Sequence, residues 1–238
     1  MPGSRLTTVI ESLDPFRSKD ESRPILTSTF VRKVKGERRG TELLEFWATD
    51  SYRAVRIGVP IDDDIEVEDP DNQLVDGVMF TLPATELRRL NAAVSGRRRK
   101  LRFLHHTYTM TMSSRDEDAG FGLTRSGAWN GRGCYVSVDD TDAPVVAAGR
   151  RHRGTYPNIV SLFTAVGEEV ELTSPLGMNP AFLGDVMRCA TRFIGGDLGA
   201  AIKLDGVQGV LKPFRFRVHQ QREDGLTFEA LMMPVRIG

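Results

Sequence analysis

The segment LMMPVRI, residues 231–237, stands immediately before the final glycine of the 238-residue sequence. It begins as an apolar strand, meets Pro234, and then places Arg236 between Val235 and Ile237. A buried core strand does not normally end in this way. Since proline cannot donate a hydrogen bond to a neighbouring strand, Pro234 belongs at a strand end or on a sheet edge. Taken alone, the segment predicts only a last strand.

A second informative stretch, FWATDSYRAVRIGVP, covers residues 46–60. Apolar and polar residues alternate on both sides of the tripeptide Thr49-Asp50-Ser51, and this alternation is typical of half-buried strands. Thr, Asp and Ser side chains close turns through their oxygen atoms. The stretch therefore predicts two strands joined by a tight hairpin, with Asp50 as a turn residue whose carboxylate bonds its own backbone.

Together the two stretches resemble the beta sliding clamp, the processivity subunit of bacterial DNA polymerase III, in its middle and C-terminal domains. In that family the hairpin carries Ala-Thr-Asp-x-x-Arg, here residues 48–53, and the chain ends in Met-Pro-x-Arg-aliphatic, here residues 233–237. Further matches lie in the family's order, and they are RPILTSTFV (23–31), FTLPATELRRLNAAV (80–94), RGTYPNIVSLF (153–163) and the segment 170–238. The resemblance covers most of residues 5–238.

Short helices alternate with strands along the chain. Apolar residues at helical spacing predict helices at 83–95 and 179–193, with a third candidate at 5–13. Asn179 is a good N-cap, and Pro180 suits the first helical position. Strands are predicted at 23–34, 42–49, 52–59, 77–82, 100–105, 107–113, 134–138, 143–148, 168–174, 200–205, 209–219 and 226–235.

Segments 77–113 and 168–219 repeat one order of strand, turn, helix and hairpin, which indicates an internal duplication. With the resemblance, this order predicts an α+β protein with a DNA-clamp fold. Its duplicated strand-helix-hairpin units would form antiparallel sheets outside and helices inside a ring. The acidic stretch 62–71 is expected to be a solvated loop that joins two such units.

The length allows about two of the three domains of a full-length bacterial clamp. Residues 1–165 are expected to resemble the middle domain, with an insertion near 114–133, and residues 166–238 the C-terminal part of the last domain. Shortened, phage-like clamps with two domains, which close as trimers, are the nearest analogue. The resemblance thus implies a closed homo-oligomer, expected to be a trimer.

The chain carries 32 Lys and Arg residues and 32 Asp and Glu residues, so its formal net charge is zero. Zero net charge argues against a simple basic nucleic-acid binder but permits segregated charge. The two cysteines, Cys134 and Cys189, form no CxxC pair, which favours a reducing compartment. The segment MPGSRLTTVIESLDPF lacks the features of an export leader, and no long apolar run occurs. We therefore expect a cytoplasmic protein without a membrane partner.

Basic residues gather on and after the two longest predicted helices, whereas acidic residues gather in loops. Arg188 and Arg192 are four residues apart and share a helix face. The run 97–100 is either a solvated charge cluster or a set of phosphate contacts, which need charge but no base-specific geometry. The resemblance turns these helices toward a central hole that holds duplex DNA of any sequence. The expected DNA-binding residues are Arg88, Arg89, Arg97, Arg98, Arg99, Lys100, Arg188 and Arg192.

The resemblance also implies a groove, between the middle and last domains, for short peptides of the replicative DNA polymerase and the clamp loader. Its positions carry over as Leu26, Thr49, Ser51, Tyr52, Arg53, Ala54, Pro157, Ser161, Leu162, Leu231, Met233, Pro234, Val235, Arg236 and Ile237. The floor would consist of Leu26, Leu162, Met233, Pro234 and Val235, and the rim donors of Arg53 and Arg236.

The groove departs from the family at three positions. The family commonly has Gly-His where this chain has Ser51 and Tyr52, and an arginine in place of Ser161. The resemblance therefore does not fix the detailed peptide specificity. The alternative for Met232 and Met233 is that both belong to the ordinary core.

The sequence offers little for catalysis. His105 and His106 adjoin in a predicted strand and point to opposite faces, so they cannot bind one metal ion together. His152 is expected in a basic loop and His219 at a strand end, and no HExxH, GxSxG, GKS/T or GxGxxG motif occurs. We expect a protein without enzymatic activity, metal ion or cofactor.

Three functions compete. The first is a sliding clamp that encircles DNA and recruits partners through the groove. The second is a clamp-like adaptor or inhibitor that binds replication proteins without encircling DNA. The third, a phage structural protein of mixed sheets, leaves the C-terminal motif unexplained.

Overall fold

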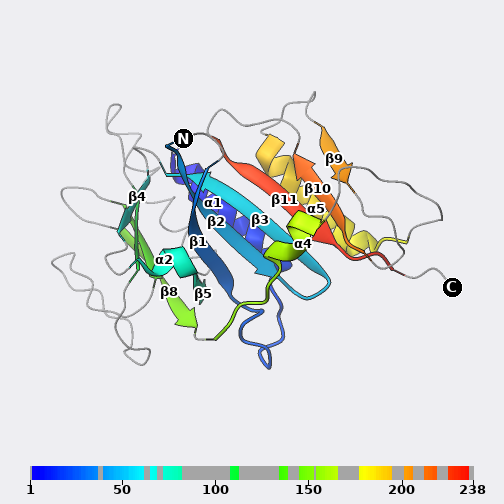
Figure 1. Ribbon diagram of the computed structural model, residues 1–238, viewed down its shortest axis with the longest axis horizontal. Coiled ribbons are helices and arrows are strands. Elements are labelled where there is room, and N and C mark those ends of the chain that lie inside the picture. The colour runs from blue at the N-terminus through cyan, green and yellow to red at the C-terminus, as the bar shows by residue number, and fades with distance from the viewer. Residues whose placement is uncertain are drawn as a thin grey trace.

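The computed structural model describes residues 2–36, 40–61, 65–68, 72–81, 108–112, 134–138, 145–152, 154–165, 177–194, 201–205, 212–218 and 225–235. Their strands form one sheet in the order β4-β6-β7-β8-β5-β1-β2-β3-β11-β10-β9 (Figure 1). The strands are β1 (Thr29–Lys35), β2 (Glu42–Thr49), β3 (Arg53–Pro60), β4 (Ile65–Glu68), β5 (Val78–Thr81), β6 (Tyr108–Met112), β7 (Cys134–Val138), β8 (Val145–His152), β9 (Ile202–Asp205), β10 (Phe214–Val218) and β11 (Thr227–Met232). The helices are α1 (Pro2–Leu13), the 3-10 helix η1 (Asp14–Phe16), α2 (Gln73–Asp76), α4 (Val160–Ala165) and α5 (Pro180–Ile194).

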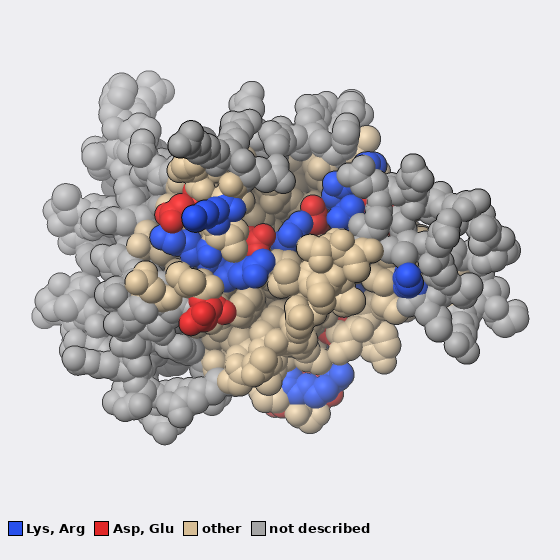
Figure 2. All heavy atoms as spheres, in the orientation of Figure 1, with Lys and Arg blue, Asp and Glu red and all other residues tan. Residues whose placement is uncertain are grey.

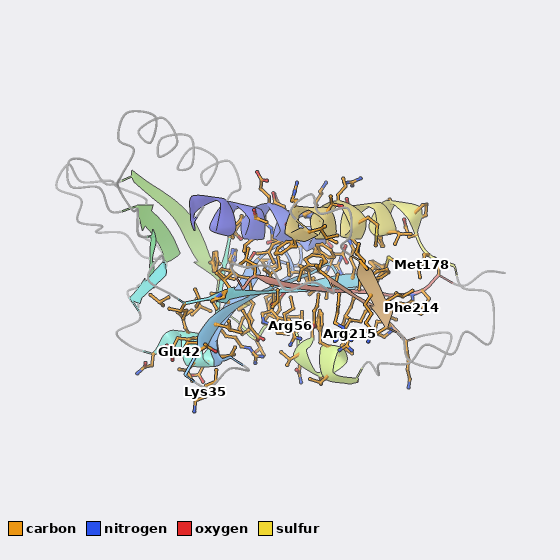
Figure 3. The ribbon with its side chains drawn as sticks, turned by 90° about the horizontal axis from the view of Figure 1, so that it is seen from above. Lys35, Glu42, Arg56, Met178, Phe214 and Arg215 are labelled. Atoms are coloured by element: carbon orange, nitrogen blue, oxygen red, sulfur yellow. The ribbon has the colours of Figure 1, made fainter. Side chains whose placement is uncertain are left out.

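Six strands at one end of the sheet come from two similar halves of the chain. In the first half α1 precedes β1, β2 and β3, and in the second half α5 precedes β9, β10 and β11. Strands β3 and β11 join the halves by antiparallel pairing in which Arg56 lies opposite Glu229. Figure 3 shows α1 and α5 side by side on one face of the sheet, with α2 and α4 on the other. The predicted α+β class with antiparallel strands is confirmed.

The main core lies between the sheet and the helices α1 and α5, on what we call the α1/α5 face. Alternation along β2 and β3 sends Phe46 and Ala48, and likewise Val55 and Ile57, toward these helices, and all four are buried. The helices supply Val9, Leu13, Val186, Cys189, Ala190 and Phe193 to the same core. Each large apolar side chain that is fully buried contributes about 1.5–3 kcal/mol. This core contains residues from both 1–165 and 166–238, so the division of the chain into these two domains stays a prediction.

A smaller core lies on the opposite side of the sheet, on what we call the α4 face. Trp47 and Leu231 project from β2 and β11 and pack against Ile159 and Phe163 of the segment that ends in α4. The Trp47 and Phe163 rings meet edge to face with their centroids 5.2 Å apart. This contact holds α4 against the sheet.

Helix α5 begins as its sequence predicts. The side-chain oxygen of Asn179 accepts hydrogen bonds from the backbone N–H groups of Ala181 (2.9 Å) and Phe182 (3.3 Å), while Pro180 takes the first helical position. These bonds satisfy donors that a helix cannot pair internally. The predicted helix at 179–193 is therefore confirmed, and so is the candidate at 5–13, which lies within α1.

Several predicted boundaries are wrong. The strand predicted at 23–34 begins only at Thr29, because residues 23–28 form turns closed by hydrogen bonds such as Leu26 N–H to the Arg23 carbonyl (2.9 Å). The strand predicted at 226–235 ends at Met232, and Val235 forms an isolated bridge with Gly177.

Other elements were not predicted. Residues 65–68 of the expected acidic loop form β4, which pairs in parallel with β6. His152 lies at the end of β8, not in a loop, and its ring nitrogen is 2.8 Å from the Thr81 hydroxyl. The short helices α2 and α4 carry too few residues to show a helical period. The remaining predictions lie outside the described residues. They are the helix at 83–95, the strands at 100–105 and 168–174, the insertion 114–133, and the positions of His105, His106 and His219.

Candidate functional site

The hairpin between β2 and β3 is closed by its own side chains. The Thr49 hydroxyl donates to the Arg53 carbonyl oxygen (2.8 Å). The Asp50 carboxylate accepts from the backbone N–H groups of Tyr52 (2.9 Å) and Arg53 (3.0 Å), so its prediction as a turn residue is confirmed. Ser51 has a φ of 82°, a left-handed conformation that favours glycine. The glycine that the resembling family commonly has at this position suits the same geometry.

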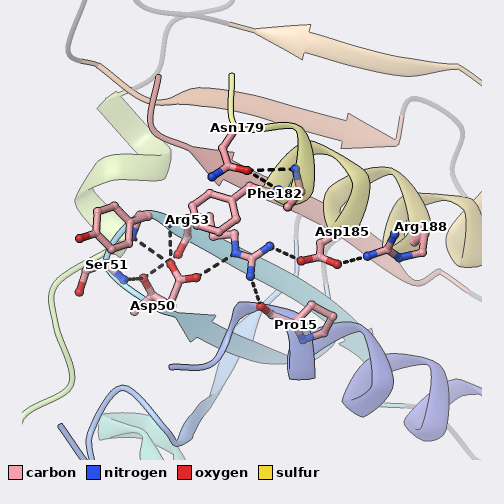
Figure 4. Close-up of polar contacts among 11 residues, drawn as sticks. Pro15, Asp50, Ser51, Arg53, Asn179, Phe182, Asp185 and Arg188 are labelled. Atoms are coloured by element: carbon pink, nitrogen blue, oxygen red, sulfur yellow. Dashed lines mark hydrogen bonds and ion pairs between the residues drawn. The ribbon is translucent and has the colours of Figure 1, made fainter. Parts of the chain in front are cut away.

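Arg53 does not offer a donor at a groove rim, and that expectation is wrong. Its side chain is only 9% exposed and bonds three separate segments: the carboxylates of Asp50 (2.9 Å) and Asp185 (2.5 Å) and the carbonyl oxygen of Pro15 (2.5 Å) (Figure 4). The guanidinium also lies 4.2 Å from the centre of the Phe182 ring. Arg53 therefore ties the hairpin to η1 and to α5.

The pKa of Asp185 reflects this arrangement. Burial would raise the pKa of the carboxyl, but the hydrogen bonds and positive charges of Arg53 and Arg188 outweigh burial and lower it from 3.8. Because the folded pKa lies below the unfolded one, Asp185 stabilises the protein fully above the unfolded pKa. This contribution is lost as the pH falls through the folded pKa.

The structure brings the hairpin and the C-terminal segment together. The backbone N–H of Met233 donates to the Tyr52 carbonyl oxygen (2.9 Å), and the N–H of Val235 donates to the Gly177 carbonyl oxygen (2.9 Å). Two residues further along the ladder, Ala54 lies directly opposite Leu231. Residues from the two sequence motifs thus meet at one end of the β3–β11 pair.

Some predicted groove residues are exposed and others belong to the core. Tyr52, Leu162 and Val235 are 61%, 44% and 48% exposed. Met233 and Pro234 are half-buried, and the Tyr52 ring lies near that of Phe182, with centroids 6.3 Å apart. Pro157 and Ser161 are exposed. Thr49, Ala54 and Leu231 are buried, so they can pack beneath the exposed residues but cannot contact a peptide directly.

The remaining predicted groove residues are Leu26, Arg236 and Ile237. Leu26 is half-buried in the turns before β1, where its carbonyl oxygen accepts from the Ser18 N–H (2.8 Å). Arg236 and Ile237 lie outside the described residues. Met232 is fully buried in the main core, which bears out the core alternative for this residue, while Met233 is only half-buried.

Two of the predicted DNA-binding residues lie on the exposed side of α5. Arg188 is 71% exposed and forms an ion pair with Asp185. Arg192 is also exposed, and its guanidinium donates to the Glu11 carbonyl oxygen of α1 (2.9 Å). The remaining candidates, Arg88, Arg89, Arg97, Arg98, Arg99 and Lys100, lie outside the described residues.

The α4 face carries alternating charges that the sequence analysis missed. Glu45 on β2 pairs with Arg32 on β1 (2.7 Å) and lies 3.7 Å from Arg56 on β3, which pairs with Glu229 on β11 (2.6 Å). Figure 2 shows the resulting interleaved basic and acidic side chains across the middle of this face. Predicting these pairs would have required the β1–β2 register, which sets Arg32 opposite Glu45, and the β3–β11 register, which sets Arg56 opposite Glu229.

A buried carboxylate extends this arrangement to β9 and β10. Asp205 is fully buried and pairs with Arg217 (2.6 Å), Arg215 (3.2 Å) and Lys203 (3.4 Å). Burial would raise the pKa of Asp205, but the hydrogen bond from Arg217 and the charges of Arg217 and Arg215 lower it. Arg215 also donates to the Phe163 carbonyl oxygen of α4 (3.1 Å), so the carboxylate helps to hold α4 in place.

No family model matches the sequence, and no curated protein matches it. Solved structures do match the fold. The DNA polymerase III beta chain of Streptococcus pneumoniae TIGR4 superposes with a TM-score of 0.50 and 14% identity, over 99% of this chain and 63% of that chain. The Helicobacter pylori beta clamp in complex with diflunisal gives 0.50 and 11%, over 98% of this chain and 64% of that chain. This chain has the sliding-clamp fold.

This chain spans less than two thirds of the length of either solved clamp. Within the described residues, its helices are too short or too polar to cross a membrane. Nor do His, Cys, Asp and Glu side chains gather in that part of the chain as a set of metal ligands would.

We predict that Arg53→Lys lowers the free energy of unfolding at pH 7 by about 2 kcal/mol, because lysine cannot direct bonds to three acceptors at once. Urea unfolding followed by circular dichroism measures the change. The deficit should begin to shrink as the pH falls below the unfolded carboxyl pKa of about 4, and it should disappear as the pH falls through the lowered folded pKa of Asp185.

Arg23→Lys is the matched control for Arg53→Lys. Arg23 pairs with Asp20 at the same sequence spacing as Arg53 with Asp50, but both partners are nearly half exposed. The control should cost less than about 0.5 kcal/mol. Equal losses for the two substitutions would show that Arg53 does not hold its three segments together.

Proposed function

We propose that this protein is a DNA sliding clamp, a processivity factor without catalytic activity, that encircles duplex DNA irrespective of sequence. In this proposal several copies close a ring, expected to be a trimer, with α1 and α5 facing the DNA. The replicative polymerase and the clamp loader bind the groove between the hairpin and the C-terminal segment. The clamp fold, which extends over nearly the whole chain, supports this proposal.

One observation carries the proposal. The two motifs that resemble the peptide-binding motifs of sliding clamps lie far apart in the sequence, yet the Met233 N–H bonds the Tyr52 carbonyl oxygen. Exposed Tyr52 and Val235 belong to these segments, and exposed Leu162 lies on α4, which packs against Leu231 of β11 through Phe163. Large apolar side chains that stay exposed near one another are typical of interaction sites.

The proposed DNA surface draws on the helices. Arg188 and Arg192 project from the side of α5 that does not contact the sheet, and Arg192 reaches α1. Long flexible cations in this position can contact phosphates without reading base edges. Arg88, Arg89 and residues 97–100 would add to this surface.

The adaptor or inhibitor remains the second candidate, since one observation favours it. Arg188 is already paired with Asp185, and the whole chain has no net charge. A protein that binds replication proteins without encircling DNA needs the groove but no basic lining. The two candidates therefore differ in assembly and in DNA binding, not in the groove.

We predict that the double substitution Tyr52→Ala, Val235→Ala weakens binding of a polymerase C-terminal peptide at least about tenfold, because two apolar contacts are lost. Fluorescence anisotropy with a labelled peptide gives the affinity. Leu204→Ala is the control, since Leu204 is an exposed apolar residue on β9, outside the groove. Unchanged affinity in the double variant would place the groove elsewhere.

The ring predicts a closed oligomer in solution. The outermost strands of the described sheet, β4 and β9, each have one neighbour, and unpaired edges must be covered or paired. Sedimentation equilibrium at micromolar concentration should give three times the 26.4 kDa chain mass. A single species at the chain mass would exclude the ring and favour the adaptor.

For DNA binding, we predict that Arg188→Ala with Arg192→Ala weakens duplex association equally for all sequences and lowers the slope of log affinity against log salt by about 2. Titrations of two unrelated duplexes at several salt concentrations test this. Arg23→Ala, which removes an exposed arginine from the turns before β1, is the control. If the double variant kept the wild-type slope, α5 would not contact the phosphates.

A further inference from the structure

One register row of charged residues crosses the α4 face from β3 to β9. Arg56 lies opposite Glu229, Glu229 opposite Arg217, and Arg217 opposite Lys203. Like charges directly opposite each other on neighbouring strands destabilise a sheet. Asp205 reduces the repulsion between Arg217 and Lys203, because its carboxylate lies 2.6 Å and 3.4 Å from their side-chain nitrogens. We call the three cations Arg56, Arg217 and Lys203 the cationic row.

The cations of this row lie nearer to the solvent than the carboxylates that pair with them. The side chains of Arg56 and Arg217 are each 26% exposed, and that of Lys203 is 42% exposed. Those of Glu229 and Asp205 are only 18% and 0% exposed. Figure 2 shows basic side chains that reach the surface across the middle of this face. A molecule that approaches from the solvent therefore meets guanidinium and ammonium groups first.

Positive charge exceeds negative charge on this part of the sheet. Within strands β3, β11, β10 and β9, the α4 face carries four basic side chains, those of the cationic row and of Arg215, and the two carboxylates of Glu229 and Asp205. Asp205 is shared by Arg215 and two members of the row, so it offsets each of these charges only in part. Because the whole chain has no net charge, this excess is a local segregation of charge.

We propose that the cationic row binds a short acidic segment of a partner protein. The row extends over three strand spacings, or about 14 Å, which an extended chain covers with about four residues. Carboxylates suit the row because a guanidinium group can donate two parallel N–H bonds to one carboxylate. A bound carboxylate would also give the cations around Asp205 a second counter-charge. The row lies on the opposite face of the sheet from α5 and includes none of the proposed groove residues, so this inference goes beyond the proposed function.

The same face is less suited to nucleic acid than to an acidic peptide. Proteins bind single strands largely by stacking bases on aromatic side chains. The rings beside the row, those of Trp47 and Phe163, are buried, and the Arg56 guanidinium lies 5.5 Å and 5.4 Å from their centres. Helix α4 stands on this face of the sheet, so a rigid duplex could not lie flat against the row (Figure 3).

Fluorescein-labelled deca-glutamate is the probe, and fluorescence anisotropy at low salt measures its affinity. Lys203→Gln with Arg217→Gln should weaken binding about tenfold and make it less sensitive to salt, because two cations are lost. Lys19→Gln with Arg23→Gln is the matched control. It also removes one lysine and one arginine, both exposed, from the segment before β1, and it should leave the affinity unchanged.

Lys203→Gln alone guards against misfolding of the double variant. Lys203 is the most exposed member of the row, and without it Asp205 keeps both arginines, so circular dichroism should be unchanged. The single substitution should weaken deca-glutamate binding about threefold. Equal affinity of the wild type, Lys203→Gln and the double variant would overturn the proposal, and so would the absence of binding by the wild type.

A ten-nucleotide oligothymidylate separates the two classes of polyanion. We expect it to bind more weakly than deca-glutamate and to lose little affinity in the Lys203→Gln, Arg217→Gln variant. Tighter binding of the oligonucleotide, lost in that variant, would assign the row to nucleic acid and overturn the proposal. None of these measurements needs a closed ring or an intact peptide groove, so the sliding-clamp proposal and this one can fail separately.

Discussion

The guanidinium of Arg53 fixes three segments that the chain order keeps apart. It bonds the hairpin through Asp50, η1 through Pro15, and α5 through Asp185. A planar fork with five donors suits three acceptors in different directions, which an ammonium group cannot match. Since the next residue back, Tyr52, bonds Met233, the position of the C-terminal segment also depends on this side chain.

Local patterns predicted the features that local chemistry controls. The alternation around Thr49-Asp50-Ser51 gave the hairpin, and the Asn179-Pro180 pair gave the start of α5, because turn and cap bonds form between close neighbours in sequence. The resemblance joined the hairpin to the C-terminal segment, and the Met233–Tyr52 bond brings them together. Strand β4 was missed because its acidic side chains resemble a loop and its pairing with β6 is a long-range contact.

The roles of single side chains were harder to predict than the elements. Arg53 lies in a motif at an apparently exposed turn, and only the tertiary packing of Phe16 and Phe182 over its guanidinium makes it internal. Ala54 and Leu231 were placed in a groove by motif position, yet α4 covers them. A cavity beside Tyr156 is lined by β1, β5 and residues 154–160, and no short stretch of sequence contains all three.

The pairing of β3 with β11 has a consequence for how the chain is made. Arg56 and Glu229, which meet across these strands, are separated by 173 positions in the sequence. A ribosome therefore completes β3 long before it delivers the strand that covers it, and in that interval one edge of β3 has no partner. Contacts between such distant residues form slowly, and an uncovered strand edge invites pairing with other chains. Premature termination before residue 227 would leave that edge open for good, so truncated products should be prone to aggregate during translation.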